Sequence, residues 1–216
     1  MVMATLPRLN AGQRALILGR TGSGKTTGAA WLLSRSAGQW VILNSKFDPL
    51  LTQCGPSVKW SAPDIQRGLI DNRIVVAHPE SYDPEILDSE LLALIETRAP
   101  VSVMVDELSY THFANGRAGP GLQGLLTRGR SRGQSFIGCT QRPAAISQFC
   151  YSESDAFGVY RITLPQDWSK LIAITGRASI KRVRAPYYWA WYDVTADRLR
   201  EYGPVPEHDL LRRFRY

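Results

Sequence analysis

The sequence is poor in cysteine and histidine and has no long apolar run. Its 216 residues include only three cysteines and three histidines. The cysteines are odd in number and lack the spacing of metal ligands, so we expect reduced thiols rather than a disulfide framework. No apolar stretch approaches the roughly 20 residues of a membrane span, and residues 1–10 contain no signal-peptide core. We therefore expect a soluble, intracellular protein with no intrinsic membrane span.

Acidic residues are outnumbered by basic ones, 19 to 26, which gives a formal net charge of +7. Charge clusters of one sign suggest a polyanionic partner, although a solvated basic face that only maintains solubility remains the alternative. Charge alone does not decide between the two. The basic clusters lie in the second half of the chain and comprise Arg128, Arg130 and Arg132, then Arg177, Lys181, Arg182 and Arg184, and finally Arg212, Arg213 and Arg215.

The segment from Gly19 to Thr26, GRTGSGKT, matches the phosphate-loop pattern with both glycines, the lysine and the hydroxyl residue in register. An apolar run precedes it and a helical pattern follows it, which is the strand-loop-helix context that such a loop needs. Lys25 is expected to reach the β- and γ-phosphates, and the Thr26 hydroxyl to bind Mg²⁺. The predicted ATP-binding residues are Gly19, Thr21, Gly22, Ser23, Gly24, Lys25, Thr26 and Thr27.

Two later strand ends carry polar residues that fit hydrolysis. The apolar run 101–105 ends in Asp106 and Glu107, which have the form of a Walker B pair. Asp106 is predicted to bind Mg²⁺, and Glu107 to orient or deprotonate the attacking water. Gln141 follows the strand at 136–140 and is predicted to contact the γ-phosphate or the water, because ligands bind at the carboxyl edge of doubly wound sheets. Solvated strand caps and a polar turn are the alternatives.

Alternating strands and helices predict one α/β domain, residues 1–216, with a mostly parallel sheet flanked by helices. Its nucleotide-binding core is expected at 11–145, and a small C-terminal β extension at 146–216. Strands are predicted at 15–18, 40–44, 74–77, 101–106, 136–140, 159–164 and 187–193, and helices at 26–36, 63–70, 84–98, 122–132 and 166–175. Asp83 is the expected cap of the third helix.

Two segments keep open interpretations. Residues 116–121 are glycine-rich and are predicted to form a loop, which is either an ordinary connector or a mobile element. The aromatic run Tyr187, Tyr188, Trp189, Trp191 and Tyr192 is interpreted as a strand that packs in the core or between subunits, with base stacking as the sharper alternative.

The motifs together resemble the FtsK–HerA superfamily of DNA-pumping ATPases over most of residues 11–145. The resemblance rests on the phosphate loop, the strand end at Asn44-Ser45-Lys46, the Asp106-Glu107 pair, and the stretch from Arg130 to Pro143. Within the superfamily, the compact form resembles the genome-packaging ATPases of tailless, membrane-containing double-stranded DNA viruses. One departure is that many relatives have Asp-Pro-Lys where this chain has Asn44-Ser45-Lys46, which puts any role of the missing acid in doubt.

The resemblance implies a RecA/ASCE-like P-loop NTPase that uses ATP and Mg²⁺ to translocate double-stranded DNA, independent of base sequence, into a preformed capsid. It implies a homo-oligomeric ring, hexameric or alternatively pentameric, in which Arg130 serves the neighbouring subunit's nucleotide as an arginine finger, with Arg128 and Arg132 as alternates. Candidate DNA contacts are Arg117, Arg177, Lys181, Arg182 and Arg184.

The same resemblance implies action in the host cytoplasm or at the packaging vertex of the virion, with a capsid-vertex or membrane protein as a further partner. Two other functions remain open from the residues alone. One is a nucleotide-dependent phage assembly or export factor that acts on protein. The other is a small-molecule kinase, which would also use a phosphate loop.

Overall fold

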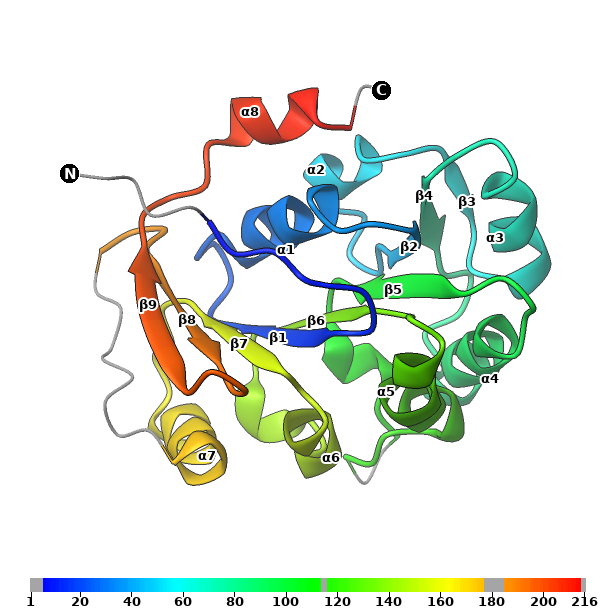
Figure 1. The fold of residues 1–216 in the computed structure, drawn as a ribbon. Coiled ribbons are helices and arrows are strands. Elements are labelled where there is room, and N and C mark those ends of the chain that lie inside the picture. Colours follow the sequence, from blue (N-terminus) through cyan, green and yellow to red (C-terminus); the bar gives the residue numbers. More distant parts are fainter. Residues whose placement is uncertain (1–5, 114–115, 177–184, 215–216) are drawn as a thin grey trace.

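A nine-stranded sheet runs through the middle of the molecule in the order β3-β4-β2-β5-β6-β1-β7-β8-β9 (Figure 1). The computed structural model describes residues 6–113, 116–176 and 185–214. Strands β1 to β7 pair in parallel, whereas β8 and β9 join antiparallel at one edge. The strands are β1 (Arg14–Leu18), β2 (Gln39–Leu43), β3 (Ser57–Lys59), β4 (Ile74–His78), β5 (Val101–Val105), β6 (Phe136–Thr140), β7 (Ala156–Val159), β8 (Trp189–Asp193) and β9 (Arg198–Tyr202).

Helices cover both faces of this sheet and bury two hydrophobic cores. One core includes α1, α2 and α8, and the other includes α3 to α7. Strand residues alternate between them: Leu16 and Leu18 pack in one core, Ala15 and Ile17 in the other, which explains the uninterrupted apolar runs. The α-helices are α1 (Lys25–Ser34), α2 (Pro49–Thr52), α3 (Ala62–Gly68), α4 (Pro84–Ile95), α5 (Pro120–Ser131), α6 (Gln148–Ser152), α7 (Pro165–Thr175) and α8 (Glu207–Arg212), with 3₁₀ turns at Leu108–Thr111 and Pro143–Ala145.

This arrangement confirms the predicted mostly parallel α/β sheet and corrects its C-terminal part. The strand predicted at 159–164 is β7, which ends at Val159 because its neighbour β1 ends at the paired residue Leu18, where the phosphate loop begins. The sequence did not indicate β9, whose charged residues at an exposed sheet edge give little hydrophobic signal. Trp189, Trp191 and Tyr192 are buried, as predicted.

Asp83 caps α4, as predicted, because its side chain accepts a hydrogen bond of 2.9 Å from the Glu85 N–H. The helix ends at Ile95, earlier than expected. At that end the Arg132 guanidinium donates to the carbonyl oxygens of Ile95 and Thr97. Arg132 therefore ties the C-terminus of α5 to the C-terminus of α4.

The glycine-rich stretch at 116–121 leads directly into α5, and its second half is docked on α4. Buried Asp88 accepts hydrogen bonds from the N–H groups of Gly121, at 2.7 Å, and Leu122, at 2.9 Å. A Cβ atom at Gly121 would lie 2.2 Å from the Asp88 carbonyl oxygen, so the close approach of the two helices requires glycine there. This half of the predicted loop is therefore a helix start rather than a flexible connector.

Cys54, Cys139 and Cys150 are all buried and unpaired, in agreement with the expected reduced thiols. In the part of the chain that the structure describes, no helix combines the length and the apolar character needed to cross a bilayer.

Candidate nucleotide-binding site

The phosphate loop connects the buried end of β1 to the start of α1. Gly22 and Gly24 have φ angles of 71° and 95°, in the left-handed region that favours glycine, so the tight turn depends on them. Gly24 is the N-cap of α1 and provides no side-chain cap to its first N–H groups. Backbone N–H groups at a helix N-terminus that have no side-chain cap are able to bind an anion.

Lys25, the first residue of α1, is buried below this loop. Its Nζ atom donates a hydrogen bond of 3.1 Å to the Arg20 carbonyl oxygen. Burial lowers its pKa. Lys25 is therefore held by the phosphate loop itself.

Asp106 and Glu107 follow β5, at the same edge of the sheet as the phosphate loop, and they lie beside the end of β2 because β2 and β5 are neighbours in the sheet. Leu43 pairs with Val105, and the Asp106 N–H donates to the Leu43 carbonyl oxygen at 3.1 Å. Asp106 is fully buried and Glu107 nearly so. Burial raises the pKa of Asp106, and the Lys46 cation offsets part of that effect.

The carboxylate oxygens of this pair have little hydrogen bonding. Both Asp106 oxygens and Glu107 Oε2 receive no hydrogen bond from any described residue, whereas Ser109 donates to Glu107 Oε1 at 3.1 Å. Buried anionic oxygens without donors are costly unless a cation compensates them. Their chemistry fits Mg²⁺, which binds carboxylate, hydroxyl and phosphate oxygens, so the predicted ligands Asp106 and Thr26 are compatible with that ion.

Lys46 is the cation that faces these carboxylates. Its Nζ atom lies 3.4 Å from Asp106 Oδ1 and 3.7 Å from Glu107 Oε2. Burial lowers the pKa of Lys46, but the two carboxylates outweigh it and the pKa is raised. From the sequence, Lys46 was placed only in a motif resemblance, and no role was predicted for it.

The turn that carries Lys46 is organised by the side chain of Asn44, which is fully buried. Asn44 Oδ1 accepts from the Asp48 N–H at 2.8 Å, and Asn44 Nδ2 donates to the Asp48 carbonyl oxygen at 3.1 Å. A carboxylate could make the first bond and not the second. The departure from the Asp-Pro-Lys pattern thus supplies a side chain that closes this turn from both sides.

Gln141 contacts the phosphate loop because β6, which it follows, lies beside β1. Leu18 pairs with Thr140, and the Gly19 N–H donates to the Thr140 carbonyl oxygen at 3.2 Å. The Thr21 hydroxyl donates to Gln141 Oε1. Gln141 is therefore linked directly to the loop that is expected to hold the phosphates.

Lys25, Lys46 and Gln141 line an open pocket of about 580 Å³, within the range of small-molecule sites. Tyr187 also lines it, with 55% of its surface exposed, and its ring lies over Gly24. Tyr187 therefore does not pack in the core, and neither does Tyr188, which is likewise exposed. Packing of these two side chains between subunits stays a prediction. The lining comprises Thr21, Gly22, Gly24, Lys25, Thr26, Thr27, Lys46, Asp48, Pro49, Gln141 and Tyr187.

The three arginines at the end of α5 lie away from this pocket. The chain continues from them into the first residue of β6, Phe136, whereas the phosphate loop follows the last residue of β1. Arg130 is exposed and pairs with Asp155 at 3.0 Å, while Arg132 binds the end of α4. Arg128 is exposed and forms no ion pair or side-chain hydrogen bond within the described ranges. A finger role for any of them concerns a neighbouring subunit and stays a prediction.

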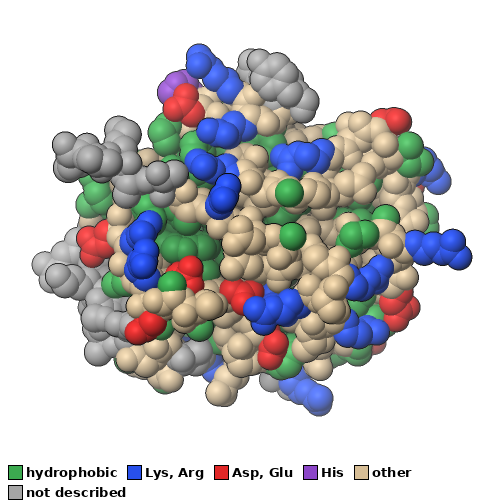
Figure 2. All heavy atoms as spheres, in the orientation of Figure 1, with side chains coloured by type: hydrophobic (Ala, Val, Ile, Leu, Met, Phe, Trp, Pro, Cys, Tyr) green, Lys and Arg blue, Asp and Glu red, His purple; other side chains and the backbone are tan. Residues whose placement is uncertain are grey.

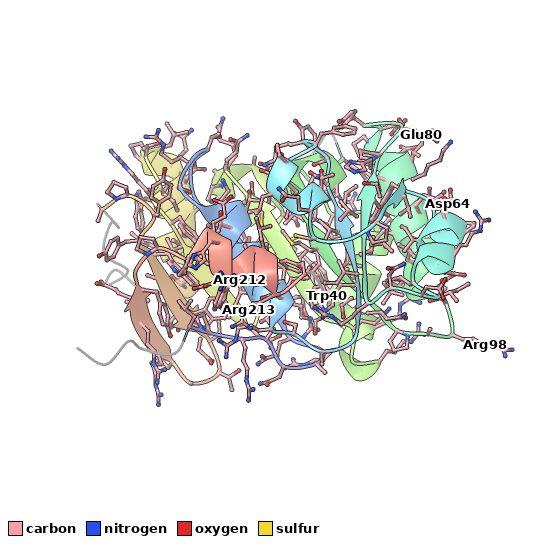
Figure 3. The ribbon with its side chains drawn as sticks, turned by 90° about the horizontal axis from the view of Figure 1, so that it is seen from above. Trp40, Asp64, Glu80, Arg98, Arg212 and Arg213 are labelled. Carbon is pink, nitrogen blue, oxygen red and sulfur yellow. The ribbon has the colours of Figure 1, made fainter. Side chains whose placement is uncertain are left out.

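The predicted DNA contacts are only partly covered by the structure. Arg117 lies on an exposed loop, whereas Arg177, Lys181, Arg182 and Arg184 lie outside the described residues. On the face shown in Figure 2, basic side chains gather over α8 and below it, and the lower half mixes both signs. Figure 3 shows Arg212 and Arg213 on α8, and the Arg213 guanidinium lies 4.7 Å from the centre of the Trp31 ring of α1.

No protein-family model matches the chain. The DNA packaging ATPase P9 of Enterobacteria phage PRD1 is 30% identical to it over 230 residues, covering 97% of this chain and 95% of that protein. Among solved structures, the genome packaging NTPase B204 of Sulfolobus turreted icosahedral virus 2, in complex with ATP-γS, superposes with a TM-score of 0.75 at 16% identity, covering 90% of this chain and 98% of B204.

A more distant structural match is EssC (ATPases 2 and 3) from Geobacillus thermodenitrificans. Its TM-score is 0.58 at 13% identity, and the match covers 94% of this chain and 43% of EssC. At these identities, B204 and EssC establish a shared fold.

Proposed function

The chain belongs to the family of viral DNA-packaging ATPases, and on that premise we propose that it hydrolyses ATP to move double-stranded DNA into a preformed viral capsid. The observation that carries the proposal is the convergence of Lys25, Asp106 and Gln141 at one sheet edge, beside a pocket of nucleotide size. The PRD1 relative is named for DNA packaging, so an export factor acting on protein is not favoured, and neither is a kinase.

In this proposal each residue of the site has one task. The N–H groups of the phosphate loop and Lys25 hold the β- and γ-phosphates, and Gln141 contacts the γ-phosphate or the attacking water. Glu107 orients or deprotonates that water. Thr26 and Asp106 are the residues that would hold Mg²⁺, which neutralises charge on the phosphates.

The proposal includes a ring of identical subunits, hexameric or pentameric, that surrounds the DNA. Arg130, with Arg128 and Arg132 as alternates, completes the nucleotide site of the next subunit. An arginine supplied in this way is worth about 10³ to 10⁵ in rate, so hydrolysis would depend on assembly. DNA would be gripped through its phosphates without regard to base sequence. We place this activity in the host cytoplasm and at the packaging vertex, where a capsid or membrane protein is the further partner.

The test is ATP hydrolysis as a function of protein concentration, with and without long double-stranded DNA. We expect turnover to rise with both. Lys25→Ala and Arg130→Ala should each be inactive alone, and a mixture of the two should regain activity because each supplies what the other lacks. Arg67→Ala is the matched control, since Arg67 is also exposed and forms an ion pair of 3.0 Å with an aspartate.

A rate of ATP hydrolysis that double-stranded DNA does not change would contradict the proposed translocase. Turnover that is independent of concentration, together with full activity of Arg130→Ala, would reject the arginine in trans while leaving the ATPase intact. A mixture that stays inactive although both variants assemble would assign Arg130 a role within its own subunit.

A further inference from the structure

Lys46 occupies the place beside the Walker B carboxylates where a cation is required. Among the described residues, Lys46 is the only one whose basic group lies within 4 Å of both carboxylates. Its Nζ atom is 3.4 Å from Asp106 Oδ1 and 3.7 Å from Glu107 Oε2. The phosphate-loop lysine does not serve this purpose, because Lys25 Nζ donates to the Arg20 carbonyl oxygen. Among the described side chains, compensation of the two buried carboxylates therefore falls to Lys46.

The turn of Lys46 is fixed on several sides, so the ammonium group is directed by the fold. Asn44 bonds both the N–H and the carbonyl oxygen of Asp48. Phe47, between them, has a left-handed φ of 54° and stacks on His78 with ring centroids 4.8 Å apart. The Tyr82 hydroxyl donates to the Ser45 carbonyl oxygen at 2.7 Å. A strained residue held by its surroundings in this way is typical of functional loops.

Lys46 nevertheless keeps access to the pocket. About a third of its side chain is exposed, whereas Asp106 and Glu107 are almost fully buried. It lines the pocket together with Lys25 and Gln141. A long, flexible side chain on a fixed turn can leave the carboxylates for the pocket without a change in the backbone.

From this geometry we propose that Lys46 is a displaceable cation, which holds Asp106 and Glu107 in the empty site and yields them to a divalent metal ion only when nucleotide phosphates enter. Lys46 and a metal ion compete for the same carboxylate oxygens, so Lys46 suppresses metal binding to the nucleotide-free protein. On nucleotide entry, the released ammonium group gains the phosphates as its new partner. Lys46 is thus a positioning residue that couples metal binding to nucleotide binding. The inference rests on the proposed function for the identity of the metal site.

The experiment titrates the nucleotide-free, full-length protein with Mn²⁺ and measures free Mn²⁺ by electron paramagnetic resonance. We expect Lys46→Met to bind Mn²⁺ about tenfold more tightly than the wild type or better, and Lys46→Arg to bind it as weakly as the wild type. Lys59→Met is the matched control, because Lys59 also pairs with a carboxylate, Glu80, at 2.8 Å, but on the surface. Lys46→Gln provides a second charge-removing variant should Lys46→Met not fold.

Two further results locate the effect. The double variant Lys46→Met, Asp106→Asn should lose the gain in Mn²⁺ affinity, and a gain that persists there would overturn the proposal. Charge-removing variants that fold and bind Mn²⁺ no more tightly than the wild type would also overturn it. The titration uses neither DNA nor hydrolysis, so it can fail while the packaging activity stands, and succeed while that activity fails.

Discussion

Arg130 and Asp155 form an ion pair of 3.0 Å that joins the C-terminal end of α5 to the start of β7. The second carboxylate oxygen of Asp155 lies 3.3 Å from the guanidinium of Arg14 and accepts from the Arg14 N–H at 2.9 Å. Arg14 is only 2% exposed, whereas Arg130 is 64% exposed. Asp155 therefore pairs with two arginines: the buried Arg14 and the exposed Arg130, which is the candidate arginine finger.

Asp155→Ala should destabilise the protein far more than Arg130→Ala. Removal of Asp155 leaves the Arg14 cation buried without a counter-charge, which costs about 3–5 kcal/mol, whereas an exposed pair contributes about 1 kcal/mol or less. Urea unfolding of the two single variants checks the difference. Equal losses of unfolding free energy would show that Arg14 does not depend on Asp155.

Alanine variants of the three arginines at the end of α5 should differ in thermal stability. Arg132 donates to the carbonyl oxygens of Ile95 and Thr97, so Arg132→Ala is expected to lower the thermal midpoint. Arg128 and Arg130 are exposed, and their alanine variants should keep a free energy of unfolding within about 1 kcal/mol of the wild-type value. Calorimetry on the three variants, followed by the mixing assay, would identify the finger. An Arg132→Ala protein as stable as the wild type would contradict the structural role of Arg132.

The phosphate loop and its helix could be predicted because the residues that identify them are consecutive in the sequence. The spacing of Gly19 to Thr26 is a local property, and so is the apolar strand before it. The site residues of β5 and β6 followed from the rule that parallel strands share one carboxyl edge. These inferences needed no knowledge of which strand lies beside which.

The contact between Lys46 and Asp106 needed that knowledge. It exists because β2 lies next to β5, although two strands and three helices separate them in the sequence. Tyr187 reaches Gly24 for a similar reason, since it precedes β8, which pairs antiparallel to β7 beside the phosphate-loop strand. Strand order and pairing direction are long-range properties, and composition or periodicity within a segment does not contain them.

Tyr187→Ala should weaken binding of ATP or ATP-γS by up to about tenfold, because an aromatic wall of the pocket contributes about 0.5–1.5 kcal/mol. Tyr187→Phe retains the ring and should bind as the wild type does. Tyr188→Ala is the control, since Tyr188 is similarly exposed but does not line the pocket. Isothermal titration calorimetry measures the three affinities. Unchanged binding by Tyr187→Ala would remove Tyr187 from the site.

Alkaline pH should destabilise the protein through its buried thiols. Burial raises the pKa of Cys54 and of Cys150 from 9.0 to about 12 and also raises that of Cys139. Above pH 9 the unfolded chain loses thiol protons that the folded protein retains, so the unfolded state is favoured as pH rises. The stabilising contribution is complete below pH 9, and for Cys54 and Cys150 it is lost progressively up to about pH 12.

Each thiol should lower the free energy of unfolding by about 1.4 kcal/mol between pH 8 and pH 10. Urea unfolding at several pH values measures the slope, and Cys54→Ala should reduce it because one titrating group is removed. The native thiols should also resist Ellman's reagent at pH 8, since all three are buried. Rapid labelling of the folded protein, or a pH slope that Cys54→Ala leaves unchanged, would contradict this account of the thiols.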